Sequence, residues 1–472
     1  MSNKAGLVGP AFSFRYKNAI TCGCKGGLLV LQICTRESIM HLGQAHRQME
    51  MRSIMNTVYT QRRKNLMADK QGPCLICIFS GRAPMKSLDA AYPFEVDRNF
   101  FYLTGIAREN MILLLQKNAA GEYSETLFIE PYDEVLAKWV GGRMREAEAT
   151  DISGIQLVRG IETFEDILNS IVERGRGCGK LHVYLDLWRY HKEQADTPAH
   201  VLAGKLQKSY PAVAIEEIHG DLAAMRAVKG EEELPFMRQA QEHTRFAIEA
   251  MMKHAYPGIN ESELEGAFDF ALMKQGVRQH AFASIVAGGA RAAILHYVDN
   301  NKVVEDGELV LIDLGSAYNN YCADISRTFP VNGKFSPRQK EIYNTVLAAQ
   351  DLVIANAKPG MTLGQLNQMV VDYYESRLDD LGLRKDGKTV RDYYYHNVSH
   401  QLGLDTHDIC TEKERTLKPG MVITVEPGMY IEEEGIGIRI ENDVLITETG
   451  CEDLSCDIVK TVEQIESLMA GH

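Results

Sequence analysis

Two apolar segments, each opened by a glycine and closed by an acid, constrain the fold more than any other feature of the sequence. Residues 307–313 read GELVLID and residues 420–426 read GMVITVE, so the acid stands six residues after the glycine in both. A second acid follows each segment after a further turn, at Asp324 and at Glu441. Short apolar runs bounded by turn residues are typical of buried strands. The pattern therefore predicts an internal repeat, in which two hairpins each carry a pair of inward-facing carboxylates.

The repeat supplies four acids, namely Asp313, Asp324, Glu426 and Glu441. Any one of them alone is more often a solvated residue at a strand end than a metal ligand, but their matched placement argues against that interpretation. Four carboxylates that converge in a buried cavity repel one another strongly and need a cationic partner. Basic residues nearby are few, with Arg327 and Arg439 the obvious ones. Two divalent metal ions are therefore the simpler counter-charge.

Three histidines, His396, His400 and His407, fall in the segment YHNVSHQLGLDTHD over residues 395–408, and His296 lies upstream in GGARAAILHY. A lone histidine is more often a core or surface residue than a ligand, so only the group as a whole indicates function. Oxygen-rich ligation with a single imidazole suits a hard or borderline ion. Mn2+ is the first expectation, with Co2+, Zn2+ or Fe2+ as alternatives, and the ligand set differs from the Cys/His sets of structural zinc.

Composition and charge exclude several classes of protein. The 472 residues carry a net charge of -13 without a long block of one sign, which argues against binding to nucleic acid or to an anionic membrane. No uncharged apolar run reaches the roughly 18 residues of a membrane span. The 10 cysteines show no regular framework and are expected as free thiols, which favours the cytoplasm. Cys74 and Cys77 have C-x-x-C spacing, but they lie in the apolar run CLICIF and are expected in the core.

The order of elements predicts two domains after an N-terminal extension. Residues 1–55 show no sustained period and form an extension of unknown role. Residues 56–220 alternate strand-like runs such as CLICIF and MILLLQK with helical stretches, which predicts an α/β domain. Residues 221–472 begin with a long amphipathic helix and contain the repeat.

Capping residues predict where helices begin in the C-terminal half. Ser336 followed by Pro337 predicts a helix over residues 337–357, and Thr362 predicts a second over residues 363–381. A further helix is expected over residues 262–274.

These motifs resemble those of the pita-bread metallopeptidases and, within them, the aminopeptidase P and prolidase branch. The resemblance is carried by LIDLGSAYNNYCADISRTF, HNVSHQLGLDTHD, VEPGMYI and GIRIEND, with ILHY upstream. QRRKNLM and YPFEVDRNFFYLTGI are similar to the aminopeptidase P N-terminal domain, so the resemblance spans residue 57 to the end. It implies an α/β N-terminal domain and an α+β pita-bread catalytic domain whose two halves are related by a pseudo-two-fold axis.

The resemblance also implies an activity, the removal of an N-terminal residue that stands before proline, and hence a peptide substrate with proline in the second position. It implies that Asp313 binds one metal ion, that His400 and Glu426 bind the other, and that Asp324 and Glu441 bridge both. A water activated by the two ions is then the implied nucleophile.

Five residues receive further implied roles. Glu426 acts as the base that passes a proton to the leaving proline nitrogen. His296 and His407 donate hydrogen bonds to the substrate carbonyl as negative charge develops on it. His396 forms a wall of the proline pocket. Arg439 orients the carboxylates that hold the metal.

One position departs from the family, since Phe282 stands where relatives often have a tyrosine near the metal site. Prolidase, which cleaves only dipeptides, is the nearest alternative, and it needs a group that captures the substrate's C-terminal carboxylate. A pita-bread module that serves only as a binding protein is disfavoured, because buried acids without metal destabilise a fold. Methionine aminopeptidases lack the N-terminal domain, and creatinase does not need the metal ligands. The resemblance implies a homodimer or homotetramer.

Overall fold

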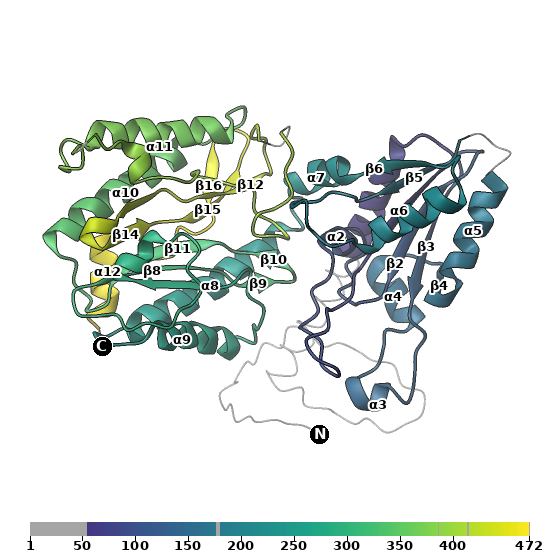
Figure 1. Cartoon of the computed structure of the whole chain (residues 1–472), viewed down its shortest axis with the longest axis horizontal. Coiled ribbons are helices and arrows are strands. Elements are labelled where there is room, and N and C mark those ends of the chain that lie inside the picture. The colour runs from purple at the N-terminus through teal and green to yellow at the C-terminus, as the bar shows by residue number, and fades with distance from the viewer. Residues whose placement is uncertain (1–53, 176–179, 386, 413–414, 472) are drawn as a thin grey trace, which may run out of the picture. The chain divides into compact units, whose positions relative to one another are not determined.

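The computed structural model describes residues 54–175, 180–385, 387–412 and 415–471 (Figure 1). The predicted extension over residues 1–55 lies outside the described residues, apart from its last two positions. No helix in the described ranges combines the length and the apolar character that crossing a membrane requires.

A six-stranded mixed sheet forms the centre of the first part of the described chain. Its strands are β1 (Cys74–Phe79), β2 (Ile112–Lys117), β3 (Tyr123–Ile129), β4 (Val158–Gly160), β5 (His182–Leu185) and β6 (Ala214–Glu217). They lie in the order β4-β3-β2-β1-β5-β6. β1 pairs antiparallel with β2 and parallel with β5. A parallel pair needs a crossover connection, and α6 (Pro198–Ser209) provides it between β5 and β6.

Helices cover both faces of this sheet. Successive residues of β1 point to opposite faces and therefore pack into two different cores. Cys74, Ile76 and Ile78 pack into the core that includes the helix over residues 54–68 and α2, whereas Leu75 and Cys77 pack with α5 and α6. Both cysteines are buried free thiols, as CLICIF predicts. The remaining helices of this part are α2 (Arg98–Thr104), α3 (Ala137–Val140), α4 (Glu146–Ser153), α5 (Phe164–Gly175) and α7 (His219–Ala227).

The second part of the chain contains the same arrangement twice, a helix pair followed by an antiparallel sheet. The first copy comprises α8 (Leu234–His254), α9 (Glu261–Lys274), β7 (Ile285–Gly288), β8 (Leu309–Leu314) and β11 (Ile325–Pro330). The second comprises α10 (Pro337–Asn356), α11 (Leu363–Arg377), β12 (Val422–Val425), β15 (Asn442–Ile446) and β16 (Cys451–Asp453). The two sheets have the orders β11-β8-β7 and β12-β15-β16. β8 is flanked by β7 and β11, and β12 is flanked by β15 and by the segment around His400, whose O accepts from Thr424 N at 3.0 Å. The strands that carry the matched glycine-to-acid segments, β8 and β12, thus each have a neighbour on both sides.

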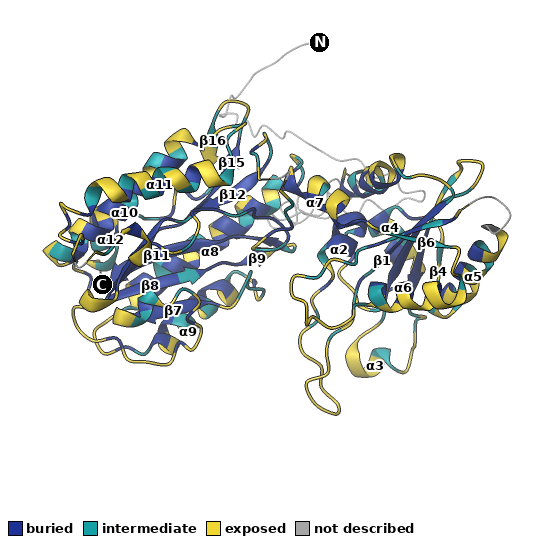
Figure 2. Ribbon diagram, turned by 45° about the horizontal axis from the view of Figure 1, so that its top comes forward, coloured by how far each residue is buried: buried dark blue, intermediate teal, exposed yellow. Residues whose placement is uncertain are grey.

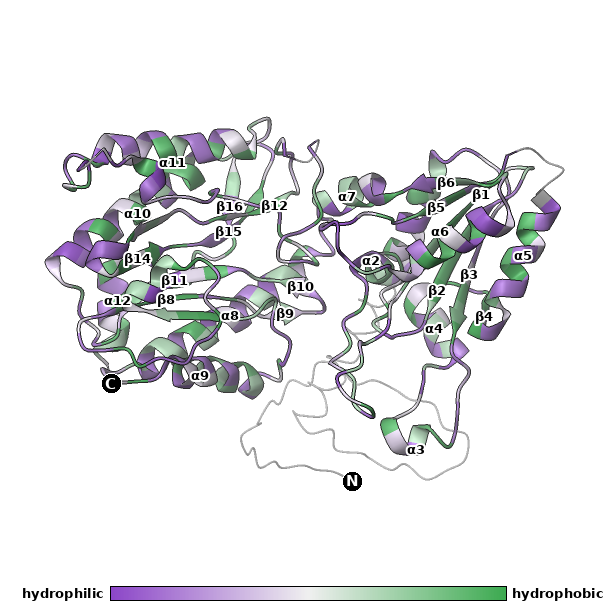
Figure 3. Ribbon diagram, in the orientation of Figure 1, coloured by the Kyte–Doolittle hydropathy of each residue, from purple (hydrophilic) through white to green (hydrophobic). Residues whose placement is uncertain are grey.

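Smaller elements complete this part. β9 (Ala317–Tyr318) pairs with β10 (Tyr321–Cys322), β13 (Gly428–Ile431) pairs with β14 (Ile436–Arg439), and α12 (Val462–Met469) is the last helix. The strands are mostly buried and the helices expose one face (Figure 2). Hydropathy follows the same division, with hydrophobic strands such as β2 and β3 and mixed helices such as α5 and α11 (Figure 3).

Helix starts agree with the predicted caps better than helix ends do. The Ser336 side chain accepts from Gln339 N in a capping box at the start of α10, and Thr362 caps α11 in the same way. The prediction of a helix that continues to residue 381 is wrong, because α11 ends at Arg377. The chain turns there: Gly382 has a φ of 65°, and Leu383 N donates to Leu378 O.

Residue 220, the predicted domain boundary, lies inside α7.

Candidate metal centre and active site

One cavity of about 890 Å³ is lined by every residue that the sequence singled out as a site residue. They are His296, Asp313, Asp324, His396, His400, His407, Glu426, Arg439 and Glu441. Phe282 also lines this cavity, which we call the catalytic cavity. The predicted site residues, which span 145 positions of the sequence from 296 to 441, therefore meet in one place.

In the first half of the repeat, one close backbone approach places two acids together. Asp313 lies near the end of β8, and Asp324 directly precedes β11, with Leu314 opposite Ile325 in the antiparallel register. A Cβ on Gly315 would lie 1.8 Å from Ala323 O. Only glycine permits this approach, so the sequence LIDLG fixes how closely the two acidic segments run.

In the second half, Glu426 directly follows β12 and Glu441 directly precedes β15. Val425 pairs with Asn442, which places the two acids side by side at the end of the hairpin. The two halves meet at Ser326 of β11: Glu441 N donates to Ser326 O at 3.0 Å, and Ser326 Oγ donates to Glu441 Oε2 at 2.8 Å. These bonds fix the hairpins against each other.

The four acids are crowded in a largely buried site. Burial, together with the neighbouring Asp313, raises the pKa of Asp324 well above its ordinary value, and burial with the other acids does the same for Glu441. Burial raises the pKa of Glu426 to about 7, despite the opposing effects of His400 and Arg439. Within the described residues, Arg439 is the only lysine or arginine that lines the cavity. The acids thus lack the positive charge that their ionised forms need.

His400 has the orientation of a metal ligand. Its Nδ1 lies 3.0 Å from Gln401 O, and a carbonyl can only accept, so Nδ1 carries the hydrogen. Nε2 then faces the acids, 3.4 Å from Asp324 Oδ2 and 3.6 Å from Glu426 Oε1. Ligand atoms of Asp324, His400 and Glu441 all lie within 4.8 Å of one another.

Arg439 and Asp313 complete the polar arrangement. The guanidinium of Arg439 donates to Asp313 Oδ2 at 2.7 Å, to Ser326 Oγ at 2.8 Å and to Tyr430 OH at 3.0 Å. Asp313 Oδ1 is buried and has no hydrogen-bond partner among the described residues. A buried carboxylate oxygen without a partner, next to three gathered ligands, fits a hard divalent cation.

The remaining histidines differ in how they are held. His396 Nε2 lies 2.9 Å from Tyr430 OH, and burial together with Arg439 lowers its pKa to about 4. His407 lies against His400, with ring centroids 4.0 Å apart, and burial lowers its pKa to about 4 with help from His400 and His296. His296 is exposed within the cavity, and no side chain among the described residues holds it by a hydrogen bond or an ion pair.

Several residues that the sequence did not single out support the site. Arg226 of α7 is buried and binds both Asp405, at 2.7 Å, and Asp408, while Lys229 binds Asp408 at 3.2 Å. These acids flank His407, so the bonds fix the segment that presents it. The signal was an arginine within the otherwise apolar run LAAMRA, together with two acids beside a histidine.

Ser326, Tyr430 and Asp443 were also missed. Asp443 Oδ2 accepts from Asp324 N at 3.0 Å, and burial raises the pKa of Asp443 well above its ordinary value. Asp443 stands two residues after Glu441, on the same side of the strand, and that spacing was the available signal. The hydroxyl roles of Ser326 and Tyr430 depend on tertiary packing, for which the sequence offers no signal.

Comparisons with known proteins follow the same division of the chain. The model of Metallopeptidase family M24 matches residues 235–448, and that of Aminopeptidase P, N-terminal domain matches residues 59–181. The Xaa-Pro aminopeptidase of Haemophilus influenzae is 35% identical over 432 residues, which cover 87% of this chain and 96% of that protein.

Two solved structures are similar in fold. A Bacillus anthracis protein assigned to aminopeptidase P has a TM-score of 0.85 and 41% identity, with 88% of this chain and 99% of that chain covered. Aminopeptidase P from E. coli with the inhibitor Pro-Leu has a TM-score of 0.79 and 32% identity, with 88% and 98% covered. These likenesses confirm the predicted fold class.

Proposed function

Since the chain belongs to metallopeptidase family M24, we propose that it is a metal-dependent peptidase that removes the N-terminal residue from peptides with proline in the second position. The observation that carries this proposal is the gathering of Asp324, His400 and Glu441 within 4.8 Å, in a cavity that Asp313 and Glu426 also line. The Xaa-Pro aminopeptidase of Haemophilus influenzae matches this chain over 96% of its own length.

Two divalent ions fit the carboxylates and the imidazole that line the catalytic cavity. Asp313 would hold one ion, His400 and Glu426 would hold the other, and Asp324 and Glu441 would be shared by both. Bound there, the ions supply Lewis-acid polarisation of the scissile carbonyl and a water of lowered pKa. Four carboxylates and one imidazole favour Mn2+ over the softer ions, although Co2+, Zn2+ and Fe2+ accept the same donors.

The side chains around the ligands move protons and stabilise charge. The Glu426 carboxylate accepts the proton of the attacking water and delivers it to the leaving proline nitrogen, which needs one because a tertiary amide nitrogen carries none. His296 and His407 donate hydrogen bonds to the substrate carbonyl oxygen as it gains negative charge. Arg439 holds Asp313, and the His396 imidazole, fixed by Tyr430, forms one wall of the pocket for the proline ring.

The cavity favours an aminopeptidase over a prolidase. A strict dipeptidase needs a cation that captures the C-terminal carboxylate of the proline. Among the described residues, Arg439 is the only lysine or arginine that lines the catalytic cavity, and its guanidinium already binds Asp313, Ser326 and Tyr430. With no cation free to select dipeptides, longer peptides are accepted.

A substrate series tests the proposal. We expect the Mn2+-loaded enzyme to release alanine from Ala-Pro-Ala at least as well as from Ala-Pro, and not from Ala-Ala-Ala. Asp324→Asn, which removes a bridging charge, should abolish both activities, whereas Asp166→Asn on the exposed first turn of α5 should leave them unchanged. Cleavage of Ala-Pro alone would establish the prolidase alternative, and no cleavage of any peptide would reject both.

The cytoplasmic location, the homodimer or homotetramer and the domain limits at residues 55 and 220 stay predictions. Size-exclusion chromatography with light scattering would measure the number of subunits.

A further inference from the structure

A second cavity, of about 440 Å³, adjoins the catalytic cavity. Tyr190 and Asp405 line both cavities, so the two share a boundary. Asp405 stands two residues before His407, and its carboxylate is held by Arg98 at 3.4 Å and by Arg226 at 2.7 Å. The boundary is therefore fixed next to a residue of the catalytic cavity.

The direction of a bound peptide follows from the proposed function, on which this inference rests. An enzyme that removes one N-terminal residue has a single residue on the N-terminal side of the scissile bond. Any longer stretch of substrate lies on the C-terminal side and continues outward by about 3.3–3.6 Å per extended residue. A cavity adjoining the catalytic cavity is thus suited to the third and following residues.

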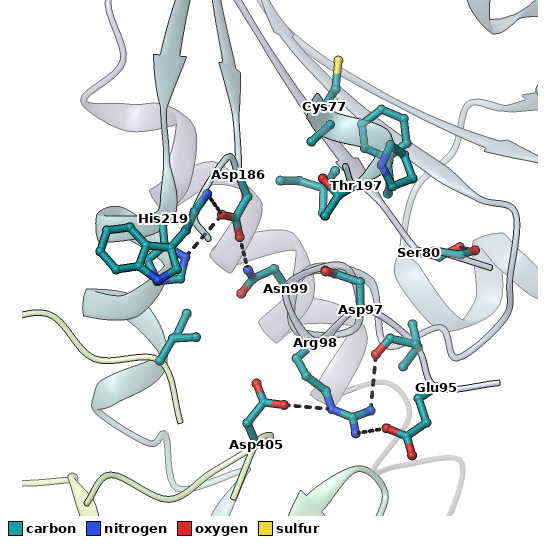
Figure 4. Close-up of a pocket in the computed structure, with 18 of the residues that line it drawn as sticks. Cys77, Ser80, Glu95, Asp97, Arg98, Asn99, Asp186, Thr197, His219 and Asp405 are labelled. Carbon is teal, nitrogen blue, oxygen red and sulfur yellow. Dashed lines mark hydrogen bonds and ion pairs between the residues drawn. The ribbon is translucent and has the colours of Figure 1, made fainter. Parts of the chain in front are cut away.

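The second cavity offers aromatic surface. Trp188 and Tyr190 are 51% and 61% exposed, which is unusual for such large side chains in a folded domain. Both rings are placed by His219: Trp188 stacks on it with centroids 5.0 Å apart, and Tyr190 meets it edge-on at 6.2 Å. Asp186 in turn binds His219 Nδ1 at 3.3 Å and Asn99 at 2.8 Å, so the aromatic surface is held in place (Figure 4).

The same cavity contains an acid without a counter-ion. Asp97 lies beside Asn99 on the wall of the cavity (Figure 4) and caps α2, with Oδ1 accepting from Phe100 N at 2.8 Å. Across the described residues, no lysine or arginine forms an ion pair with Asp97, since Arg98 binds Glu95 and Asp405 instead. Desolvation raises the pKa of Asp97 to about 6, although the hydrogen bond from Phe100 N and the more distant charge of Arg226 act in the opposite direction.

We propose that this second cavity binds the part of the substrate that follows proline, and that it selects a basic side chain there through Asp97 and the aromatic surface of Trp188 and Tyr190. An arginine guanidinium stacks on an aromatic face and pairs with a carboxylate at once. The substrate class is then peptides with proline second and arginine or lysine third or fourth.

A peptide series measures this selection. The C-terminally amidated peptides Ala-Pro-Ala-Ala, Ala-Pro-Arg-Ala and Ala-Pro-Ala-Arg are compared by kcat/KM for alanine release from the metal-loaded enzyme. We expect arginine at position three or four to raise kcat/KM about tenfold, mainly through KM. Asp97→Asn keeps the shape and the helix cap, because asparagine also caps helices. It should reduce the arginine advantage to below about twofold, whereas Asp166→Asn should keep the wild-type ratio.

Three outcomes would overturn the inference while leaving the proposed function intact. They are hydrolysis of all three peptides at equal kcat/KM, an arginine advantage that survives Asp97→Asn, and a dependence on Asp97 that appears only when arginine replaces the N-terminal alanine. The last result would assign the cavity to the first residue of the substrate. Failure of the wild-type enzyme to release alanine from any peptide would instead reject the proposed function.

Discussion

Arg439 shows how much of the metal centre depends on the geometry of one side chain. Its guanidinium binds Asp313 Oδ2, Ser326 Oγ and Tyr430 OH at the same time, and so sets the direction in which Asp313 Oδ1 points. The charge alone does not explain this role, because lysine carries the same charge without the planar fork of donors.

Arg439→Lys should therefore weaken metal binding although the charge is kept. We expect metal affinity to fall by about 10- to 100-fold, the usual effect of losing a group that orients a ligand. Competition with a metal-binding dye measures it. Arg245→Lys is the matched control, because Arg245 is partly exposed on α8 and pairs there with Glu242 and Glu249. An unchanged metal affinity in Arg439→Lys would show that Asp313 needs no orientation.

His296→Ala separates a catalytic role from a ligand role. His296 lies on the cavity wall but outside the group of Asp324, His400 and Glu441. We expect kcat to fall by about 100-fold, because a donor to the developing oxyanion is lost. The metal content by elemental analysis should match that of wild type, as should that of the control His254→Ala at the exposed end of α8. Equal loss of activity and metal would make His296 a ligand.

At the scale of elements, the position of the segment from Asp405 to Asp408 is fixed by α7 and the residues that directly follow it. Arg226 and Lys229 reach the two acids, and the carboxylate of Asp408 is buried with them. Burial alone would raise the pKa of Asp408, but the two cations outweigh it and hold the pKa below its ordinary value. A depressed pKa means that the ionised form stabilises the fold.

Asp408→Asn should thus destabilise the protein in a pH-dependent manner. Near pH 7 the free energy of unfolding should fall by about 3–5 kcal/mol, because two buried cations lose their partner. The contribution is present above the unfolded-state pKa of about 3.9 and is lost as pH falls through the lower folded-state value. The difference between wild type and variant in denaturant titrations should consequently begin to shrink below about pH 4, and should vanish only below the folded-state pKa. A difference that is equally large at pH 3.5 and pH 7 would mean that charge is not its cause.

The elements themselves were more predictable than their ends and neighbours. Ser336 and Thr362 predicted helix starts because capping is local, whereas the end of α11 depends on the turn at Gly382. Among the nine predicted site residues, the four acids were singled out because acids at strand ends are costly and were repeated, whereas the histidines and Arg439 were singled out by their grouping and by the family resemblance. Arg226 and Tyr190 were not, since their importance arises only when distant segments pack together.

At the scale of the whole molecule, the proposed metal centre lies where the two copies of the repeat meet. β8 supplies Asp313, and Asp324 directly precedes β11; Glu426 directly follows β12, and Glu441 directly precedes β15. Without cations, the acids repel one another across the junction between the copies. The order of strands in the six-stranded sheet and the second cavity were beyond sequence reasoning, because both depend on which segments meet in space.

Removal of metal should therefore lower the stability of the whole fold. Ions that bind only the folded chain at 100 times their Kd contribute about 2.7 kcal/mol each. We expect chelation to lower Tm by roughly 5 °C or more, and added Mn2+ to restore it. An unchanged Tm, with loss of metal shown by elemental analysis, would mean that the acids tolerate one another without cations.

Anomalous diffraction from crystals grown with Mn2+ tests the central claim most directly. We predict two manganese peaks in the catalytic cavity, one against Asp313 and one against His400 and Glu426, with Asp324 and Glu441 between them. A single peak elsewhere, or a cavity without any peak at saturating Mn2+, would contradict the assignment of these five residues as the metal centre.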